Sequence, residues 1–470
     1  MLKSMRNINS NDSAMFVGQE AGGVLMDFEQ LSGESASVHY MPFVEQFNDV
    51  LLAGPQPSSA GLALFEDGIN SDTAVEDLIP YSLRSHHGIF FTPEKTAELC
   101  ADICATNIAA EESFFDPACG TGNLLYAIAQ RYTIKNSISE TLVYWGRRFG
   151  GCDINESFVH VAKLRLVALA ARRHNMPALD GALLIELLEN LSNFHVADYL
   201  GSELGAEFDC IVANPPFGHR DFKKTLRWSS GRTQLASVFV SAIVSRGKQG
   251  QKVVSILPDV LKSGTRYARW REMISEGTLK GTVHPYGKFS ASVDVDVFIF
   301  ESFISKYYKN KESVVWVEDI STSNVGLRLG EFCTVNIGPV VPHRLKPDSK
   351  NKVPYICVKT CPPYKAIKAT KVIGFDGTLY SPPFVVVRRT SNPGDKHRII
   401  TTLVLGKQPI AVENHLIIIR PNDGYIKTCK KVLGFLKTES AVLQINAMIR
   451  CRHLTKHSIS SLMIVGGPNE

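Results

Sequence analysis

Long apolar runs are missing from this sequence, and none approaches the roughly 20 residues that a helix needs to cross a bilayer. The N-terminus carries Lys3 and Arg6, but these are not followed by the apolar segment that a secretory signal peptide requires. We therefore expect a soluble, cytoplasmic protein with no membrane partner.

Cysteine is present, but not in metal-binding patterns. The ten cysteines are scattered, and the closest pairs, Cys100/Cys104 and Cys357/Cys361, lack the C-x2-C spacing of a zinc site. We expect reduced, mostly buried thiols and no metal. The sequence also lacks G-x-x-x-x-G-K-[ST] and a complete G-x-G-x-x-G, so neither an ATP site nor a dinucleotide site is well supported.

Charge is unevenly distributed along the chain. Of its 51 Lys and Arg and 46 Asp and Glu, 21 and 7 lie between Val341 and Glu470, which leaves 30 and 39 in residues 1–340. A basic C-terminal third on a mildly acidic body is typical of a polyanion-binding module attached to an enzyme. The alternative is a solvated basic surface without a partner.

The 470 residues, 44% of them hydrophobic and 21% charged, are enough for two or three globular domains. Residues 1–80 are acidic and rich in Gly, Ser, Asn and Asp, which predicts a helical or partly disordered lead-in. In residues 81–310 strands alternate with helices, which predicts a doubly wound α/β domain. Residues 311–470 predict a separate α+β domain, with strands at 384–390, 399–404 and 415–420 and helices at 425–437 and 440–450.

A strand, a Gly-rich turn and a helix open the α/β domain. The strand ends at Asp116, and Gly120 and Gly122 allow the backbone to approach a ligand at the start of the helix. A second strand ends at Asp153, where a carboxylate can accept hydrogen bonds from ribose hydroxyls, and a third ends near Asp198. All three carboxylates stand where the ligand crevice of such a sheet would lie.

Two helices accompany these strands. Thr92 suits the N-cap of a helix that runs from Pro93 to about Ile108, with the proline at its first position. An amphipathic helix is expected from about Asn155 to Arg173.

The most informative stretch is Asn214-Pro215-Pro216-Phe217, which follows the apolar run 208–213, a predicted buried strand. The two prolines have fixed φ angles and no N–H groups, so the turn is stiff. An amide oxygen, an open carbonyl and an adjacent aromatic ring form a cradle for an exocyclic amino group on a flat heterocycle. The simpler alternative is a turn that only ends the strand.

Farther along, the runs 281–284 and 294–300 predict a hairpin at the sheet edge, with Tyr286 and Phe289 in its loop. Taken in order, these motifs resemble those of S-adenosylmethionine-dependent adenine-N6 DNA methyltransferases, a group that includes the methylation subunits of type I restriction systems. The resemblance covers residues 88–302 and implies a Rossmann-like methyltransferase sheet followed by a target-recognition domain.

Within this resemblance, Gly88–Pro93 is similar to the family's first motif, Asp116–Leu125 to its cofactor loop, and Asn214–Phe217 to its catalytic tetrapeptide. The loop that holds Phe289, or alternatively Tyr286, is similar to the element whose aromatic ring contacts the flipped base. The cofactor residues that the resemblance implies are Thr92, Pro93, Asp116, Ala118, Gly120, Gly122, Asp153 and Asp198.

The resemblance also implies a mechanism. The Asn214 side-chain oxygen and the Pro215 carbonyl would accept hydrogen bonds from adenine N6, which exposes the lone pair of that nitrogen for attack on the sulfonium methyl group. The base must first leave the duplex, and Phe217 and Phe289 would stack on it. The implied catalytic residues are Asn214, Pro215, Pro216 and Phe217.

The densest basic cluster of the C-terminal third surrounds a Pro-Gly turn and also includes His397 and Lys407. Arg can bond guanine in the major groove, whereas Lys mostly meets phosphates. The predicted contacts to double-stranded DNA are Arg388, Arg389, Lys396 and Arg398.

Other functions stay open at this point. Cytosine N4, RNA adenine or a protein glutamine amide could occupy the same cradle, and the chain could be a catalytically idle DNA-binding subunit of a defence system. A nicotinamide oxidoreductase would explain the glycines and Asp153 but not the tetrapeptide. No nuclease signature of the P-D…(D/E)-x-K kind stands out. We therefore predict modification without cleavage, in a restriction-modification or orphan modification system, with any restriction nuclease as a separate partner.

Overall fold

The computed structural model describes residues 34–53, 78–79, 90, 92–226, 228–290, 293, 295–307, 313–316, 326–345, 351–391, 395, 397–449 and 452–464. The chain divides into two compact units, one of residues 1–261 and 266–315 and one of residues 262–265 and 316–470. Each unit has its own hydrophobic core.

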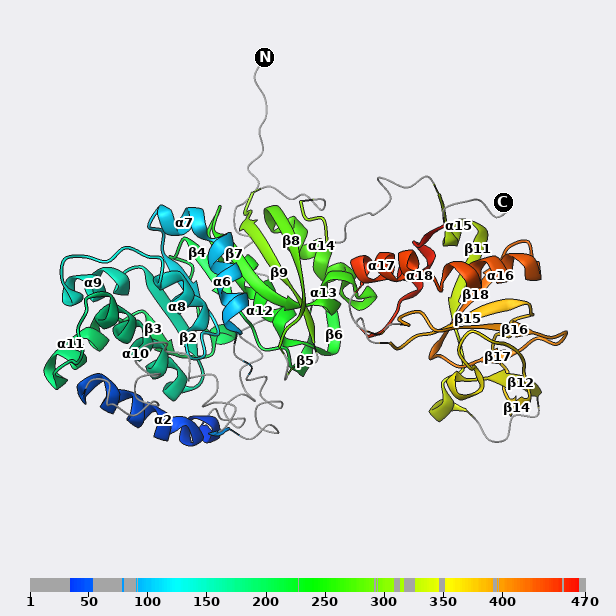
Figure 1. Ribbon diagram of the computed structural model, residues 1–470, viewed down its shortest axis with the longest axis horizontal. Helices are drawn as coiled ribbons and strands as arrows, with labels where there is room; N and C mark the ends of the chain where they lie inside the picture. The colour runs from blue at the N-terminus through cyan, green and yellow to red at the C-terminus, as the bar shows by residue number, and fades with distance from the viewer. Residues whose placement is uncertain are drawn as a thin grey trace, which may run out of the picture. The chain divides into compact units, whose positions relative to one another are not determined.

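A seven-stranded sheet forms the centre of the first unit (Figure 1). Its strands, in spatial order, are β3 (Phe194–Val196), β2 (Phe149–Asp153), β1 (Phe114–Asp116), β4 (Cys210–Ala213), β7 (Lys252–Pro258), β9 (Asp296–Ile304) and β8 (Thr278–Lys288). The first five strands are parallel, and β9 runs antiparallel to both of its neighbours. The hairpin expected at the sheet edge is thereby confirmed.

Helices cover both faces of the sheet, because neighbouring residues of a strand point to opposite sides. Phe114 contacts Tyr132 on one side, whereas Phe115 contacts Tyr199 on the other, and Tyr199 in turn stacks on Phe239 of α12 (Leu235–Arg246). The doubly wound fold is therefore confirmed. Phe114 shares its core with α6 (Glu94–Ile103), α7 (Ala105–Ala109), α8 (Asn123–Ala129), α9 (Ile138–Gly146), α10 (Glu156–Arg173) and α11 (Gly181–Asn190), whereas α14 (Ala268–Glu276), which follows α13 (Asp259–Ser263), packs on α12.

The helix predicted from about Asn155 to Arg173 is confirmed as α10, but it is buried on most of its sides, so its predicted amphipathic character is wrong. Part of the reason is α2 (Glu34–Ala53), which comes from the N-terminal segment and packs against α10. The ring of Tyr40 meets Phe158 edge-on, with centroids 5.2 Å apart. Tyr40 and Phe158 lie in the same core as the sheet. The N-terminal segment thus contributes a helix to the first unit.

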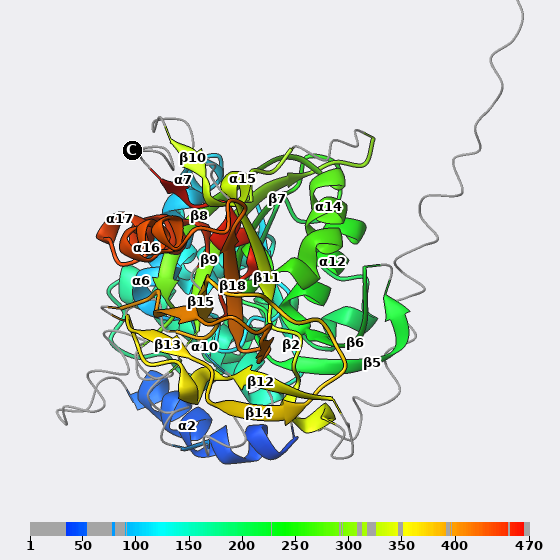
Figure 2. The same cartoon turned by 90° about the vertical axis from the view of Figure 1, so that its right-hand side faces the viewer.

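A further hairpin, which the sequence did not predict, follows the Asn-Pro-Pro-Phe turn. Strand β5 (His219–Leu226) pairs antiparallel with β6 (Ser229–Gln234), and their register shifts between Phe222 and Leu226. Figure 2 shows the two strands side by side. The pair forms a small sheet of its own, separate from the central sheet.

The second unit mixes strands and helices, as predicted for an α+β domain. A five-stranded sheet holds β11 (Cys333–Ile337), β18 (Leu416–Pro421), β15 (Phe384–Arg388), β16 (Thr401–Leu405) and β13 (Ala366–Lys368) in that order. Smaller sheets comprise β14 (Lys371–Gly374), β12 (Lys352–Ile356) and β17 (Ala411–Val412), and β10 (Leu327–Arg328) with β19 (Met463–Ile464). Its helices are α15 (Leu329–Phe332), α16 (Ile426–Phe435), α17 (Glu439–Met448) and α18 (Lys456–Ser460).

The cysteines agree with the expectation of mostly buried thiols. Those in the described ranges are free, and all of them except Cys357 are buried. Within the same ranges, no helix is both long enough and apolar enough to cross a membrane.

Candidate active site

The strand order places Asp116 and Asn214 at neighbouring positions. From β1 the chain builds outward to β2 and β3, then returns to β4 on the other side of β1. The order therefore reverses between β1 and β4, and open α/β sheets bind their ligands at the carboxyl ends of the strands beside such a reversal. Asp116 is the last residue of β1, and Asn214 directly follows β4.

The side chain of Asn214 is held in a defined orientation. Its Nδ2 donates a hydrogen bond to the backbone carbonyl of Phe90, at 3.2 Å. A carbonyl can only accept, so the amide nitrogen must face Phe90 and the oxygen must point elsewhere. Among the residues that the structure describes, Oδ1 has no hydrogen-bond partner, although it is buried. A buried acceptor without a partner is costly unless a ligand satisfies it.

The short segment before α6 links the tetrapeptide to the glycine turn. Phe90 accepts from Asn214, and two residues later the carbonyl of Thr92 accepts from Nδ2 of Asn123, at 2.7 Å. Asn123 is the first residue of α8, directly after Gly122. The prediction that the Thr92 side chain caps the helix is wrong, because the N-cap position is Pro93 and no side chain caps it. Thr92 instead contributes its backbone carbonyl to the site.

The glycine turn has the backbone conformation that the sequence predicted. Gly120 and Gly122 have φ angles of +49° and +82°, a region that other residues rarely adopt. At Gly122 there is also little room, since an added Cβ would lie 3.0 Å from the Cβ of Ala162 in α10. The N–H of Ala118 donates to Asp116, at 3.0 Å, so the turn starts on that carboxylate.

Three carboxylates surround this turn. Burial, and then the nearby charge of Asp153, raise the pKa of Asp116 to about 8. Burial also raises the pKa of Asp153, although it accepts hydrogen bonds from the N–H of Gly120, at 3.1 Å, and from Asn155. Burial, and then the charges of Asp153, Asp116 and Asp198, raise the pKa of the Cys152 thiol on β2.

Asp198 resembles Asn214 in having an acceptor without a partner. Its Oδ1 accepts from the N–H of Leu200, at 2.9 Å, but its buried Oδ2 has no partner in the described part of the chain. Burial raises the pKa of this carboxyl group. The site thus offers open acceptors and carboxyl groups whose charged form a nearby cation would stabilise, which suits a ligand with cationic groups and N–H or O–H donors.

Two residues that sequence reasoning missed support the turn. Arg165 of α10 is buried and donates to the carbonyl of Thr121, at 2.8 Å, and to Oδ1 of Asn123. Asn155 fixes Oδ1 of Asp153 through its N–H and its Nδ2, at 2.9 and 3.0 Å. A single arginine in the apolar run of α10 is the signal that could have identified the first of them.

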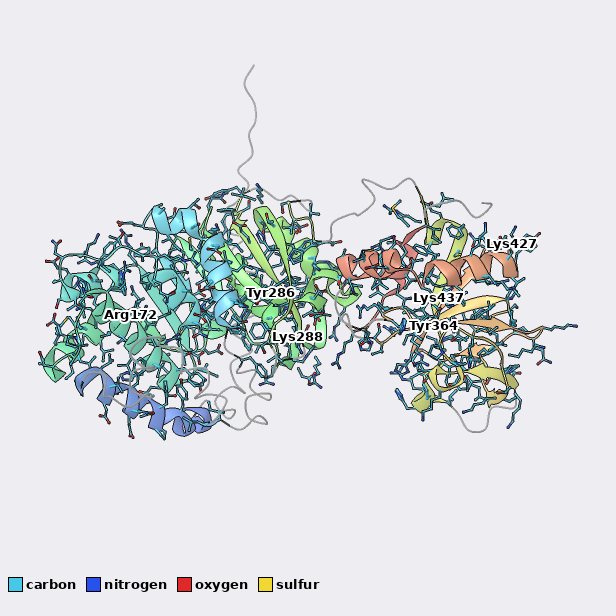
Figure 3. All side chains as sticks on the ribbon, viewed as in Figure 1. Arg172, Tyr286, Lys288, Tyr364, Lys427 and Lys437 are labelled. Atoms are coloured by element: carbon cyan, nitrogen blue, oxygen red, sulfur yellow. The ribbon has the colours of Figure 1, made fainter. Side chains whose placement is uncertain are left out.

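The aromatic residues lie close to the tetrapeptide. The rings of Phe217 and Phe289 meet nearly perpendicularly, with centroids 5.2 Å apart. Phe289 is only 2% exposed, so it would have to be uncovered before a base could stack on it. Tyr286 is half-buried, and its hydroxyl accepts from Oγ1 of Thr96, at 2.8 Å (Figure 3). Of the two rings, Tyr286 is the more accessible, although it lies within β8 and not in the loop where it was predicted.

In the second unit, one predicted DNA contact has to be corrected. Arg398 is fully buried and donates to the carbonyls of Ser391, at 2.6 Å, and Ile449, at 3.1 Å, so it supports the fold and cannot reach DNA in this structure. Arg388 and Arg389 are half-buried at the end of β15. Lys396 lies outside the described residues.

A different group of side chains gathers near Arg388. Tyr364 has a φ angle of +62°, which is strained for an aromatic residue. Its ring lies 5.6 Å from that of His397, and Nζ of Lys437 lies 5.0 Å from its centroid. Figure 3 labels Tyr364 and Lys437. Burial raises the pKa of Tyr364, and the charge of Arg388 partly opposes this.

A family model described as N-6 DNA Methylase matches residues 80–327, which is more than half of the chain and contains every element of the site in the first unit. The chain belongs to the N-6 DNA methylase family. The family assignment confirms the resemblance to methyltransferases that the motifs indicated.

Individual relatives are more distant from this N-6 DNA methylase. The type II methyltransferase M.VspI of Vibrio sp. (strain 343) is 26% identical over 151 residues, which cover 32% of this chain and only 30% of that protein. The structure of the type IIL restriction-modification enzyme MmeI with DNA matches 86% of this chain and 70% of that one, at 11% identity and a TM-score of 0.46. A type I methyltransferase subunit from Streptococcus thermophilus matches 54% and 53%, at 16% identity and a TM-score of 0.32.

Proposed function

We propose that this chain transfers a methyl group from S-adenosylmethionine to N6 of an adenine that has left the DNA duplex. The observation that carries the proposal is the orientation of Asn214, whose Nδ2 is held by the Phe90 carbonyl while the buried Oδ1 is without a partner among the described residues. An exocyclic amino group would supply the missing donor.

The tetrapeptide acts on this amino group through its acceptors. If Oδ1 of Asn214 and the Pro215 carbonyl each accept one N–H, the nitrogen lone pair is less delocalised into the ring and becomes more nucleophilic. Because the turn is stiff and the amide is already oriented, little reorganisation accompanies the reaction. Phe217, and Tyr286 or Phe289 after a rearrangement, would stack on the base, which is worth roughly 1–3 kcal/mol per base.

The carboxylates and the glycine turn fit S-adenosylmethionine, which supplies the methyl group when it is bound. Asp116, whose raised pKa reflects burial and the nearby Asp153, would pair with the ammonium group at the glycine turn. Asp153 would accept from the ribose hydroxyls and Asp198, through its open Oδ2, from the adenine amino group. The remaining contacts would come from Thr92, Pro93, Ala118, Gly120 and Gly122.

We further propose that the second unit recognises the DNA. Its excess of basic residues supports this, and the surface that we favour is built from Tyr364, His397, Lys437 and Arg388. One relative is a type II methyltransferase, and matching structures include restriction-modification proteins. We propose a role in such a system, with cleavage left to a separate nuclease.

Substitution of Asn214 tests the proposal. We expect Asn214→Ala to lower methylation by at least about 10²–10³-fold, because one oriented group at the reacting atom is lost, while calorimetry shows cofactor binding near that of the parent. Asn193→Ala is a matched control. Asn193 also donates to a backbone carbonyl, that of Gly146, but it lies at the amino end of β3, away from the carboxyl ends where Asn214 lies. Parent-like methylation by Asn214→Ala would refute the role.

The base and the atom are identified by two further measurements. DNA from a methylation-free host that expresses the chain is read by long-read sequencing and, after digestion, by nucleoside mass spectrometry. N6-methyladenine at a defined sequence is expected, whereas N4-methylcytosine would refute the choice of base.

A further inference from the structure

The β5–β6 hairpin is attached directly to the catalytic tetrapeptide. His219 follows Phe217 by two positions, and at the other end of the hairpin Nε2 of Gln234 donates to the Phe217 carbonyl, at 2.6 Å. The N–H of Leu235 donates to the carbonyl of Gly218, at 2.8 Å. Both ends of the hairpin are therefore fixed to the turn that holds Asn214.

The hairpin is also packed, along β5 and at its turn, against the rest of the first unit. Phe222 and Trp228 are buried, and the Trp228 ring lies 6.4 Å from that of Tyr267, next to α14. The Tyr267 hydroxyl accepts from the N–H of Gln234, at 3.2 Å. These contacts give the hairpin a fixed direction relative to the tetrapeptide.

The hairpin is basic, although residues 1–340 as a whole are acidic. The segment 219–234 contains five Lys and Arg and a single acid, Asp221. The side chains of His219 and Arg232 are exposed, and so is Arg266, which donates to the carbonyl of Arg232. Burial, and then the charges of Arg232 and Arg266, lower the pKa of His219, so its neutral imidazole lies beside two arginines.

The one acid of the hairpin, Asp221, lies opposite Arg232 in the pairing of β5 with β6. The structure describes both residues, and no ion pair joins their side chains. Phosphate oxygens are the usual partners of exposed arginines in nucleic-acid recognition.

We propose that the β5–β6 hairpin binds backbone phosphates of the DNA next to the extruded base, with Arg232 and His219 as contacts. The inference rests on the proposed function and deepens it, because a hairpin fixed to the tetrapeptide also fixes the DNA strand relative to Asn214. Phosphate contacts position a nucleic acid without reading its sequence. This role is therefore separate from sequence recognition by the second unit.

The salt dependence of DNA binding tests the hairpin. The full chain is titrated with a fluorescently labelled duplex of random sequence at a series of salt concentrations. We expect Arg232→Ala to make the slope of log affinity against log salt shallower by about 0.9 for each phosphate that the variant no longer neutralises. Arg232→Lys keeps the charge and should retain most of the slope.

Arg147→Ala is the matched control, because Arg147 is also an exposed arginine of the first unit but precedes β2, at the amino ends of the parallel strands. It should keep the parent slope. If Arg232→Ala shifts the slope no more than Arg147→Ala does, the hairpin does not bind phosphates. Each variant should unfold at the melting temperature of the parent, which would confirm that folded proteins are being compared.

The same variants separate this inference from the proposed function. Arg232→Ala should lose methylation activity at lower salt than the parent does, whereas Arg147→Ala should follow the parent. A parent chain that does not methylate DNA would refute the proposed function. A parent that methylates, together with an Arg232→Ala variant of unchanged salt response, would refute the hairpin inference alone.

Discussion

The acids at the carboxyl ends of the parallel strands (the carboxyl edge) and those at the amino ends (the amino edge) are shifted in opposite directions in pKa. At the carboxyl ends of the strands, burial raises the pKa of Asp116, Asp153 and Asp198. Toward the amino ends, burial likewise tends to raise the pKa of Asp209 and Glu301, but hydrogen bonds outweigh it and lower both values. The acids of the amino edge therefore have partners that stabilise their charged form, whereas burial dominates at the carboxyl edge.

The partners at the amino edge can be named. Lys248 lies 2.9 Å from Asp209, and Lys252 lies 3.0 Å from Glu301, which His284 contacts on its other oxygen. At the carboxyl edge the open acceptors, within the described part of the chain, include Oδ1 of Asn214, Oδ2 of Asp198 and Oδ1 of Asn155. Shifted pKa values occur both in structural ion pairs and in ligand sites. Here the direction of the shift and the open acceptors distinguish the ligand site from the structural pairs.

The largest expected effect on stability is at the amino edge. The side chains of Lys252 and Glu301 are only 5% and 21% exposed, and removal of one partner of a buried pair costs about 3 kcal/mol. We expect Lys252→Met to lower the free energy of unfolding by roughly that amount, measured by chemical denaturation, with cofactor affinity of the folded protein unchanged. The exposed Lys280 on β8 is the control, and Lys280→Met should have little effect. A loss below about 1 kcal/mol would mean that the pair is not structural.

At the carboxyl edge the same kind of change should stabilise the ligand-free protein. Asp116 has a folded-state pKa of about 8 against an ordinary value of 3.8, so between these values the folded chain holds a proton that the unfolded chain has lost. Stability therefore falls as the pH rises through this window. Asp116→Asn removes this pH-dependent loss of stability. At pH 8 the variant should have a free energy of unfolding at least about 1 kcal/mol above that of the parent, and below pH 4 the two proteins should differ little.

Cofactor binding should respond to Asp116→Asn in the other direction. The asparagine keeps an acceptor for the N–H of Ala118 but has no charge to pair with a cationic ligand. We expect weaker binding of S-adenosylmethionine by calorimetry and a flatter dependence of that affinity on pH below 8. If Asp116→Asn were less stable than the parent near pH 8, Asp116 would not belong with the acids of the carboxyl edge, whose charged form burial disfavours.

The residues of the carboxyl edge could be predicted because their positions follow from local patterns. Asp116, Asp153 and Asn214 each end or follow a short apolar run, and strand ends of a parallel sheet meet at one edge. The links between them could not be predicted, because they join residues far apart in the chain. Asn214 and Phe90 are 124 positions apart, and Asn123 and Thr92 are 31.

Charge clusters were harder to interpret from the sequence than strand ends. Arg398 was grouped with exposed arginines because a charge count says nothing about burial, although Ile399 and Ile400 directly after it indicated an approach to the core. The β5–β6 hairpin was missed because its strands lack a regular alternation of apolar and polar residues. Its Phe222 and Trp228 are buried by tertiary packing, which a single segment does not indicate.

The smallest expected effect concerns the exposed ion pair of the amino edge. Asp209 and Lys248 are 39% and 43% exposed, so solvent screens their attraction, and Asp209→Asn should cost no more than about 1 kcal/mol. Because hydrogen bonds from Lys248 and Ser113 overcome burial and lower the pKa of Asp209, its contribution is present above pH 3.8 and is lost as the pH falls through the folded-state value. Denaturation of Asp209→Asn and of Asp49→Asn, an exposed control on α2, should therefore differ at neutral pH and converge in acid. If Asp209→Asn became more stable than the parent as the pH rose, Asp209 would resemble the acids of the carboxyl edge, whose charged form burial disfavours.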